Sequence, residues 1–192
     1  MGRPLDLVRR DVMLGRAADY VLANGLAGVS LRPMAEALDT SPRMLLYDFE
    51  SKEKLISSIL TEIRQREATL LSTHLAGVSR SAPDLLRFAW TWISAPAQEP
   101  FLRLFFQVYV DAISRPDAYG GAAKAMVGDW LDTVSAIVGG PTAEATATLF
   151  VAVVRGLLLD GQATGDRTRT NDAMESFIGL IGRDETATNR SR

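Results

Sequence analysis

Apolar side chains recur at the spacing of an α-helix along the whole chain of 192 residues. Met13, Ala17, Tyr20 and Val21, for example, occupy positions i, i+4, i+7 and i+8 and form one apolar stripe. No segment alternates apolar and polar residues over the length of a strand, and no tight turn lies between two strand-like runs. We therefore expect an all-α protein.

The chain contains no Cys, and His74 is its only imidazole. These counts exclude zinc sites built from Cys and His and nucleophilic catalysis by a Cys-His pair. No paired carboxylates, glycine-rich phosphate loop or nucleophile-base spacing stands out. We expect no enzyme activity, no catalytic residues, no metal and no cofactor.

Length and hydropathy limit the architecture further. A chain of this size buries about 70% of the surface that its unfolded state exposes, enough for one globular domain or for two units that share a core. The longest uninterrupted apolar stretch runs from Leu149 to Val154, far short of the roughly 20 residues of a membrane helix. Because the N-terminus has no signal-peptide core either, we expect a cytoplasmic protein that does not associate with a membrane.

The charge is nearly balanced, with a formal net charge of -2. Nonspecific nucleic-acid coating requires a surplus of Lys and Arg on the binding face, so this balance argues against that class of protein. Residues 1–54 hold eight basic and eight acidic side chains. Residues 1–16 carry four Arg against two Asp, which leaves a small basic arm that begins Gly2-Arg3-Pro4.

The first 50 residues contain start and stop signals for short helices. Gly25 ends the first predicted helix, because glycine accepts the left-handed C-cap conformation without steric cost. Ser30 is placed as the N-cap of a second, two-turn helix that ends near Leu38. Ser41 and Pro42 then provide an N-cap and a first helical residue after a break of only three residues. Two short helices around a tight turn form a helix-turn-helix.

A fourth helix is expected from Lys52 towards His74, and prolines divide the chain beyond it into further helical segments. The last ten residues, 183–192, have little apolar content and are expected to form a disordered tail.

The segment from Ala143 to Leu159 is apolar around its full circumference and must be buried on both faces. One face packs on its own domain, and a two-fold dimer is the commonest partner for the other. Gly156, which costs about 1 kcal/mol in mid-helix, suggests the close approach of another helix. A central helix in a monomeric bundle is the alternative.

Residues 13–55 resemble the DNA-binding domain of TetR/AcrR-type transcriptional regulators. The resemblance rests on Met13-Leu14, Ala17, Gly25, Val29-Ser30, Met34-Ala35, the run from Thr40 to Phe49 and Ser51-Lys52-Glu53-Lys54-Leu55. Leu149 to Asp166 is similar to the long helix with which family members dimerise. The resemblance implies a three-helix helix-turn-helix DNA-binding domain at residues 1–54. It also implies a larger helical effector-binding and dimerisation domain at residues 55–182, with dimer contacts from helices at about 143–181.

Two positions depart from the family pattern. Family members usually carry Tyr three residues before the Phe that closes the recognition helix, and His directly before that Phe; here these residues are Leu46 and Asp48. An acidic side chain near a phosphate weakens binding, so the usual Tyr and His contacts do not transfer. Tyr47, one position along, is the substitute that we expect.

The second helix of a helix-turn-helix enters the major groove, where its first residues reach base edges. Arg43 can donate two hydrogen bonds to guanine, and Met44 can pack on a thymine methyl group. Lys52 is placed to hold a phosphate at a helix N-terminus, and Arg3 to enter a minor groove. The alternatives are a solvated Arg43 and a disordered arm. The full predicted DNA-binding set is Arg3, Arg32, Ser41, Pro42, Arg43, Met44, Tyr47 and Lys52.

Aromatic residues gather between Phe88 and Trp130, either as plain core or as the lining of a ligand pocket. By resemblance to the sensor domains of the family, the predicted ligand-binding residues are Trp90, Phe105, Tyr109, Met126, Trp130 and Arg155. Gln107 and Asp111 are further polar candidates.

Together these features predict a homodimeric regulator, acting as a repressor, that binds a palindromic operator in double-stranded DNA. An apolar or amphipathic small-molecule effector would release it. The alternative is a helical ligand-binding or protein-interaction module whose helix-turn-helix no longer binds DNA; Asp48, Leu46 and the neutral N-terminal domain motivate it.

Overall fold

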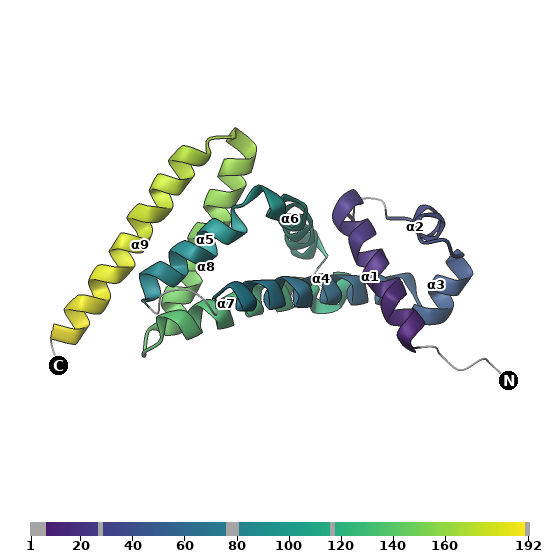
Figure 1. Cartoon of the computed structure of the whole chain (residues 1–192), viewed down its shortest axis with the longest axis horizontal. Coiled ribbons are helices and arrows are strands. Elements are labelled where there is room, and N and C mark those ends of the chain that lie inside the picture. The colour runs from purple at the N-terminus through teal and green to yellow at the C-terminus, as the bar shows by residue number, and fades with distance from the viewer. Residues whose placement is uncertain (1–6, 27–28, 76–80, 116–117, 191–192) are drawn as a thin grey trace. The chain divides into compact units, whose positions relative to one another are not determined.

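The computed structural model describes residues 7–26, 29–75, 81–115 and 118–190, without the side chains of residues 75, 118, 120 and 182–190. This part of the chain contains nine α-helices and two short 3-10 helices, with no strand among the described residues (Figure 1). The all-α expectation is confirmed. None of the described helices combines the length and the apolar character needed to cross a membrane.

The helices pack as two compact units. The first comprises residues 1–69 with 99–126, and the second comprises residues 70–98 with 127–192. Helices α4 (Lys52–Leu75) and α7 (Ala122–Val138) each begin in the first unit and end in the second. These units are defined by packing alone, so the functional division expected after residue 54 stays a prediction.

Three helices at the start of the first unit form the helix-turn-helix and its support (Figure 1). They are α1 (Leu7–Asn24), α2 (Leu31–Ala37) and α3 (Pro42–Phe49). Gly25 ends α1 in the left-handed region with a φ of 73°, which confirms the predicted stop. Val21, Met34 and Leu45 contribute one fully buried side chain each from the three helices.

Helix α6 (Glu99–Ser114) and the short η2 (Ala118–Gly121) complete the first unit with the start of α7. The side-chain oxygen of Gln107 on α6 accepts a hydrogen bond of 2.9 Å from the backbone amide of Leu26, directly after α1. Arg66 on α4 pairs with Asp19 on α1 at 2.7 Å. Polar contacts therefore join α1 to both α4 and α6.

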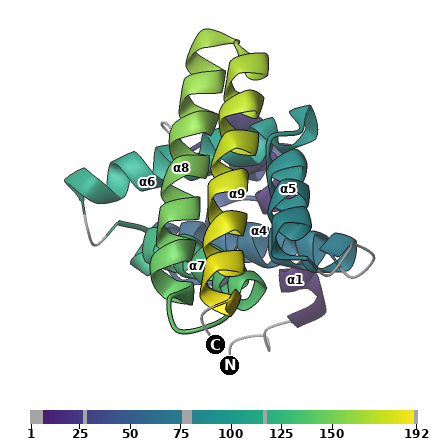
Figure 2. The same cartoon turned by 90° about the vertical axis from the view of Figure 1, so that its left-hand side faces the viewer.

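The second unit contains α5 (Ala82–Ile93), η1 (Pro96–Gln98), most of α7, α8 (Ala143–Thr164) and α9 (Arg167–Arg190). Figure 2 shows α8 and α9 side by side. Their contact buries Phe150, Met174 and Ile178, and the Phe150 ring lies 6.4 Å from that of Phe177. Backbone helix extends to Arg190, whereas side chains beyond Ile181 lie outside the described residues, so the disordered tail at 183–192 stays a prediction.

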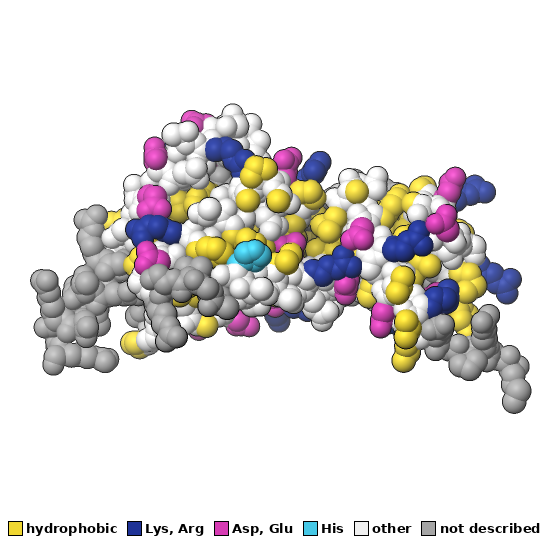
Figure 3. Space-filling view, viewed as in Figure 1, with side chains coloured by type: hydrophobic (Ala, Val, Ile, Leu, Met, Phe, Trp, Pro, Cys, Tyr) yellow, Lys and Arg dark blue, Asp and Glu magenta, His cyan; other side chains and the backbone are white. Residues whose placement is uncertain are grey.

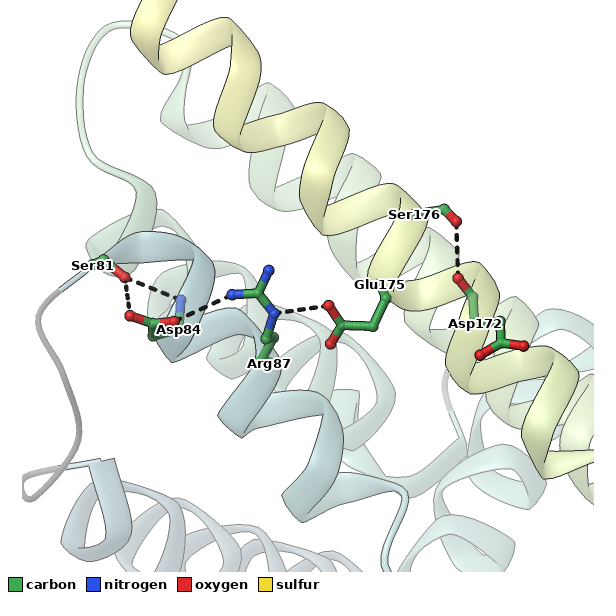
Figure 4. Close-up of polar contacts among 6 residues, drawn as sticks. All are labelled: Ser81, Asp84, Arg87, Asp172, Glu175 and Ser176. Carbon is green, nitrogen blue, oxygen red and sulfur yellow. Dashed lines mark hydrogen bonds and ion pairs between the residues drawn. The ribbon is translucent and has the colours of Figure 1, made fainter.

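Polar contacts join α5 to α9 within the second unit (Figure 4). Arg87 donates from Nε to Glu175 at 2.8 Å and pairs through Nη1 with Asp84 at 3.2 Å. Further along the two helices, Trp90 Nε1 donates to Asn171 at 2.9 Å. The bonds to Glu175 and Asn171 fix the register between α5 and α9, because each joins a side chain of α5 to one of α9.

Candidate functional site

The start of α3 is built by the residues that the sequence places there. Ser41 is the N-cap, with extended backbone, and its hydroxyl oxygen accepts a hydrogen bond of 3.2 Å from the amide of Met44. Pro42 is the first helical residue, where its missing amide hydrogen removes no intrahelical bond. The predicted start of the third helix is confirmed.

The α3 helix has one buried face and one exposed face. Leu45, Asp48 and Phe49 are buried, whereas Arg43, Met44, Leu46 and Tyr47 are exposed. Arg43 and Tyr47 are four residues apart and therefore share one face of the helix. This face presents a cation, a phenol and apolar side chains, a combination suited to base edges and phosphates.

Other predicted DNA-binding residues occupy the elements next to α3. Arg32 is exposed on α2, and Lys52 is the first residue of α4. At the start of α4, the Ser51 hydroxyl oxygen accepts a hydrogen bond of 3.1 Å from the Lys54 amide. Arg3 lies outside the described residues. Seven of the eight predicted residues are thus described, on α2, at the N-cap and along α3, and at the start of α4.

The turn between α3 and α4 carries an ion pair. Glu50 has a positive φ of 67°, and its carboxylate accepts a hydrogen bond from the Lys54 ammonium group. The hydrogen bond and the charge of Lys54 lower the pKa of Glu50 below its ordinary value of 4.5. The turn therefore presents a paired carboxylate beside Lys52.

Asp48, one of the two departures from the family pattern, is turned away from the exposed face of α3. Its side chain is 2% exposed, and both carboxylate oxygens accept hydrogen bonds from Arg9 Nη2, at 2.5 and 2.8 Å. Arg10 donates from Nε to the Asp48 backbone oxygen at 3.1 Å. The carboxylate is turned into the domain because two arginines of α1 meet the last turn of α3. The Asp48 carboxylate is therefore paired inside the domain, and its effect on DNA binding stays open.

The surface around these helices is mixed in charge. In Figure 3, basic and acidic side chains alternate with apolar ones over the N-terminal helices on the visible face. This distribution agrees with the equal numbers of basic and acidic residues in the first 54. Any binding to DNA must therefore depend on individual contacts more than on a broad basic surface.

The predicted ligand-binding residues fall into two groups, one in each unit. Phe105, Tyr109 and Met126 belong to the first. The Phe105 and Tyr109 rings are stacked at 6.0 Å on α6, and Phe105 and Met126 are buried. Gln107, between them in sequence, is engaged by the Leu26 amide.

Trp90, Trp130 and Arg155 belong to the second unit. Trp90 is buried and donates to Asn171, whereas Trp130 lies 6.3 Å from Trp92, ring to ring. Arg155 is half-buried on α8. Within the described residues, no group of three or more His, Cys, Asp and Glu side chains is placed to hold a metal ion.

Sequence reasoning missed the partners of several site residues. Arg9 and Arg10 were counted only as members of a basic arm, and Asn171 was not singled out. Arg9 and Asp48 are 39 positions apart in the sequence, so no local signal predicts their pairing. A helical position with an acidic residue among apolar neighbours, as at Asp48, is the one clue that a cation lies opposite.

Comparison with known proteins gives a result for the fold only. No protein-family model matches the sequence, and no curated protein sequence matches it. Solved structures do match over nearly the whole chain. A TetR-family transcriptional regulator from Cytophaga hutchinsonii has a TM-score of 0.77 at 18% identity, over 95% of this chain and 96% of its own.

Two further structures agree with that match. A TetR transcriptional regulator from Legionella pneumophila has a TM-score of 0.67 at 18% identity, over 94% of this chain and 97% of its own. The multidrug binding protein EbrR, complexed with imidazole, has a TM-score of 0.68 at 22% identity, over 94% of this chain and 93% of its own. EbrR has also been solved with proflavin.

Proposed function

We propose that this chain, which has the fold of the TetR-family transcriptional regulators, is a DNA-binding transcription regulator. The observation that carries the proposal is the exposed face of α3, where Arg43, Met44 and Tyr47 project from a helix that Ser41 caps. The same α2 and α3 pair forms a helix-turn-helix, the arrangement that places its second helix in a major groove.

Each exposed side chain has a distinct task in this proposal. Arg43 donates two hydrogen bonds to a guanine, a contact worth about 1–3 kcal/mol of discrimination against another base. Met44 packs against a thymine methyl group, and Tyr47 donates to a phosphate. Lys52 holds a phosphate together with the first amides of α4.

We further propose that the chain works as a homodimer through α8 and α9. Small and apolar residues of α8 are exposed at alternate spacings of four and three: Ala145, Leu149, Ala152, Gly156, Leu159 and Ala163. Leu149 and Leu159 are 61% and 49% exposed, and Leu180 on α9 is 58% exposed. This spacing is the one with which two helices pack side by side along their length. A methyl group built on Gly156 would meet nothing within 4 Å, so the chain itself leaves this point of α8 open.

A symmetric dimer accounts for the operator that we propose. Two recognition helices about 34 Å apart meet successive major grooves on one side of the duplex. Because the two subunits are related by a two-fold axis, the preferred sequence is a palindrome.

An apolar or amphipathic effector is proposed to bind near the aromatic residues. Phe105, Tyr109 and Met126 are the candidate contacts in the first unit, and Trp90, Trp130 and Arg155 are the separate candidates in the second. The complexes of EbrR with imidazole and proflavin support a planar, partly apolar ligand. Such an effector releases DNA only if it binds the DNA-incompetent conformation more tightly. To move the protein from mostly DNA-bound to mostly free, the effector must prefer the DNA-incompetent conformation by about 5.5 kcal/mol. In the cell, the effector would then lift repression.

Selection of a random double-stranded DNA pool on the purified protein at moderate salt tests this function. The expected result is an enriched palindrome whose half-sites are about one helical turn apart. A folded dimer that enriches no sequence, after removal of any carried-over ligand by unfolding and refolding, would contradict the proposal. That outcome would favour the helical interaction module, whose binding to DNA should depend little on sequence or salt.

A further inference from the structure

Two consecutive arginines of α1 contact the last turn of the recognition helix α3. Arg9 donates from Nη2 to both carboxylate oxygens of Asp48, at 2.5 and 2.8 Å. Arg10 donates from Nε to the Asp48 backbone oxygen at 3.1 Å, and its guanidinium carbon lies 4.7 Å from the centre of the Phe49 ring. We call these four residues the arginine clamp.

The clamp lies at the flank of the exposed face of α3. Asp48 follows Met44 by four residues, so the two side chains occupy neighbouring positions on one side of the helix. The Asp48 side chain is 2% exposed, whereas that of Arg9 is 39% exposed. One partner of the pair is therefore inside the domain, and the other reaches the surface next to the last turn of α3.

The charges of this pair cancel where a DNA backbone would approach. An exposed arginine next to a recognition helix ordinarily binds a phosphate and releases a counterion, which strengthens binding to every sequence alike. A carboxylate that accepts two hydrogen bonds from one guanidinium nitrogen competes directly with a phosphate for that group. Because the carboxylate is buried, the loss of Arg9 would leave an unpaired charge inside the domain, at a large cost in free energy.

We propose that Asp48 is a positioning residue of the DNA-binding surface: it retains Arg9 on the protein, so that Arg9 fixes α3 and adds no phosphate contact. This inference rests on the proposed DNA-binding function. By removing one sequence-independent contact from each subunit, the clamp leaves discrimination to Arg43 and Met44.

The test uses the full-length dimer and the operator obtained by selection, with a scrambled duplex of equal length as the nonspecific probe. Asp48→Asn keeps the shape of the side chain and one acceptor oxygen but removes its charge. Each freed Arg9 should steepen the dependence of log K on log salt by about 0.9. For a dimer, the loss of binding between about 50 and 200 mM salt then grows about tenfold, on the operator and on the scrambled duplex alike.

Two control variants separate this effect from structural damage. The double variant Arg9→Gln, Asp48→Asn removes both charges and should restore the salt dependence of the native protein. The Asp39 side chain pairs at 3.1 Å with Arg16, which like Arg9 belongs to α1, but it is 88% exposed. Asp39→Asn should therefore leave the salt dependence of DNA binding unchanged. Asparagine also tolerates the positive φ of 53° at that position.

Three results would overturn the proposal. The first is an unchanged salt dependence in a folded Asp48→Asn variant, and the second is an equal steepening in Asp39→Asn. The third is a double variant with a salt dependence shallower than the native one by about 0.9 per subunit, since Arg9 would then already contact a phosphate. This third comparison decides the question even if Asp48→Asn alone does not fold. A native protein that selects no operator contradicts the proposed function, whereas normal selection with any of these three results contradicts the clamp alone.

Discussion

The α2–α3 pair and the α8–α9 pair are both two-helix units, but opposite features hold them together. Helices α2 and α3 have 7 and 8 residues, whereas α8 and α9 have 22 and 24. A helix shorter than about 12 residues is marginal by itself, so the first pair depends on the Ser41 cap and the arginine clamp. The second pair is held by buried side chains such as Phe150 and Met174.

The exposed faces of the two pairs differ as well. Helix α3 exposes Arg43 and Tyr47, whose polar groups can donate to bases and phosphates. Helix α8 exposes Leu149 and Leu159 among small residues, a surface that gains from contact with another apolar surface. The side chains left exposed on each pair suit the partner proposed for it: DNA for the first pair and a second copy of the chain for the other.

The largest expected effect comes from a charge placed on the exposed apolar face of α8. Leu149→Glu would bury an unpaired carboxylate in each half of the proposed dimer interface. We expect the dimer dissociation constant to rise about 100-fold or more, and operator binding to fall with it. Sedimentation over a range of protein concentrations measures the change. Ala23→Glu introduces the same charge at an exposed position of α1 and should leave the dimer intact; equal dissociation in both variants would contradict the assigned interface.

A smaller effect is expected at the proposed contacts with DNA. Arg43→Ala should relax the preference for one base pair in each half-site, at a cost of about 1–3 kcal/mol on the best sequence. Lys52→Ala should weaken all sequences alike and flatten the salt dependence by about one unit per subunit. Repeating the selection and the salt titration with both variants measures these outcomes. Equal losses on every sequence for both variants would remove Arg43 from the base-reading residues.

The dependence of the short helices on caps can be tested with a matched pair of serines. Ser41→Ala removes the acceptor of the Met44 amide and should lower the free energy of unfolding by about 1 kcal/mol. Ser30 is also an N-cap, but its side chain makes no capping hydrogen bond, so Ser30→Ala should change stability very little. Chemical denaturation of both variants gives the comparison. A larger loss for Ser30→Ala would show that side-chain capping does not explain the start of α3.

The smallest expected effect concerns the turn after α3. The Lys54 ammonium group lowers the pKa of Glu50 in the folded protein, so the ion pair adds stability above the ordinary value of 4.5. That contribution is lost as the pH falls through the lowered pKa. Glu50→Gln should remove this part of the pH dependence, which thermal unfolding between pH 3 and pH 7 measures. Because the pair is exposed, the change should be small, and a large loss at neutral pH would assign Glu50 another role.

Much of the fold follows from local signals in the sequence. Ser41 and Pro42 start α3, Gly25 ends α1, and Lys52 begins α4, all as predicted. Caps, proline and left-handed glycine act through hydrogen bonds between residues a few positions apart, so the sequence contains both partners within one short window. The apolar period likewise predicted the buried residues Met13, Ala17 and Val21 of α1.

The sequence did not predict how the candidate ligand-binding residues are grouped in space. Phe105 and Tyr109 are four residues apart on one helix, and their stacking follows from helical spacing. Trp90 pairs with Asn171, and Gln107 pairs with the Leu26 amide, each across 81 residues. Only the packing of helices brings such partners together, and no window of sequence contains both.

By itself, then, the sequence determined an all-α chain with a capped helix-turn-helix and a long apolar helix, because helix formation and capping are local. The tertiary structure alone decided the role of Asp48. In sequence it is a carboxylate at a position where a DNA contact is usual; in the fold it is a buried partner of Arg9. The reason is that the energy of a buried charge depends on the group placed opposite it, and that placement exists only after α1 has packed against α3.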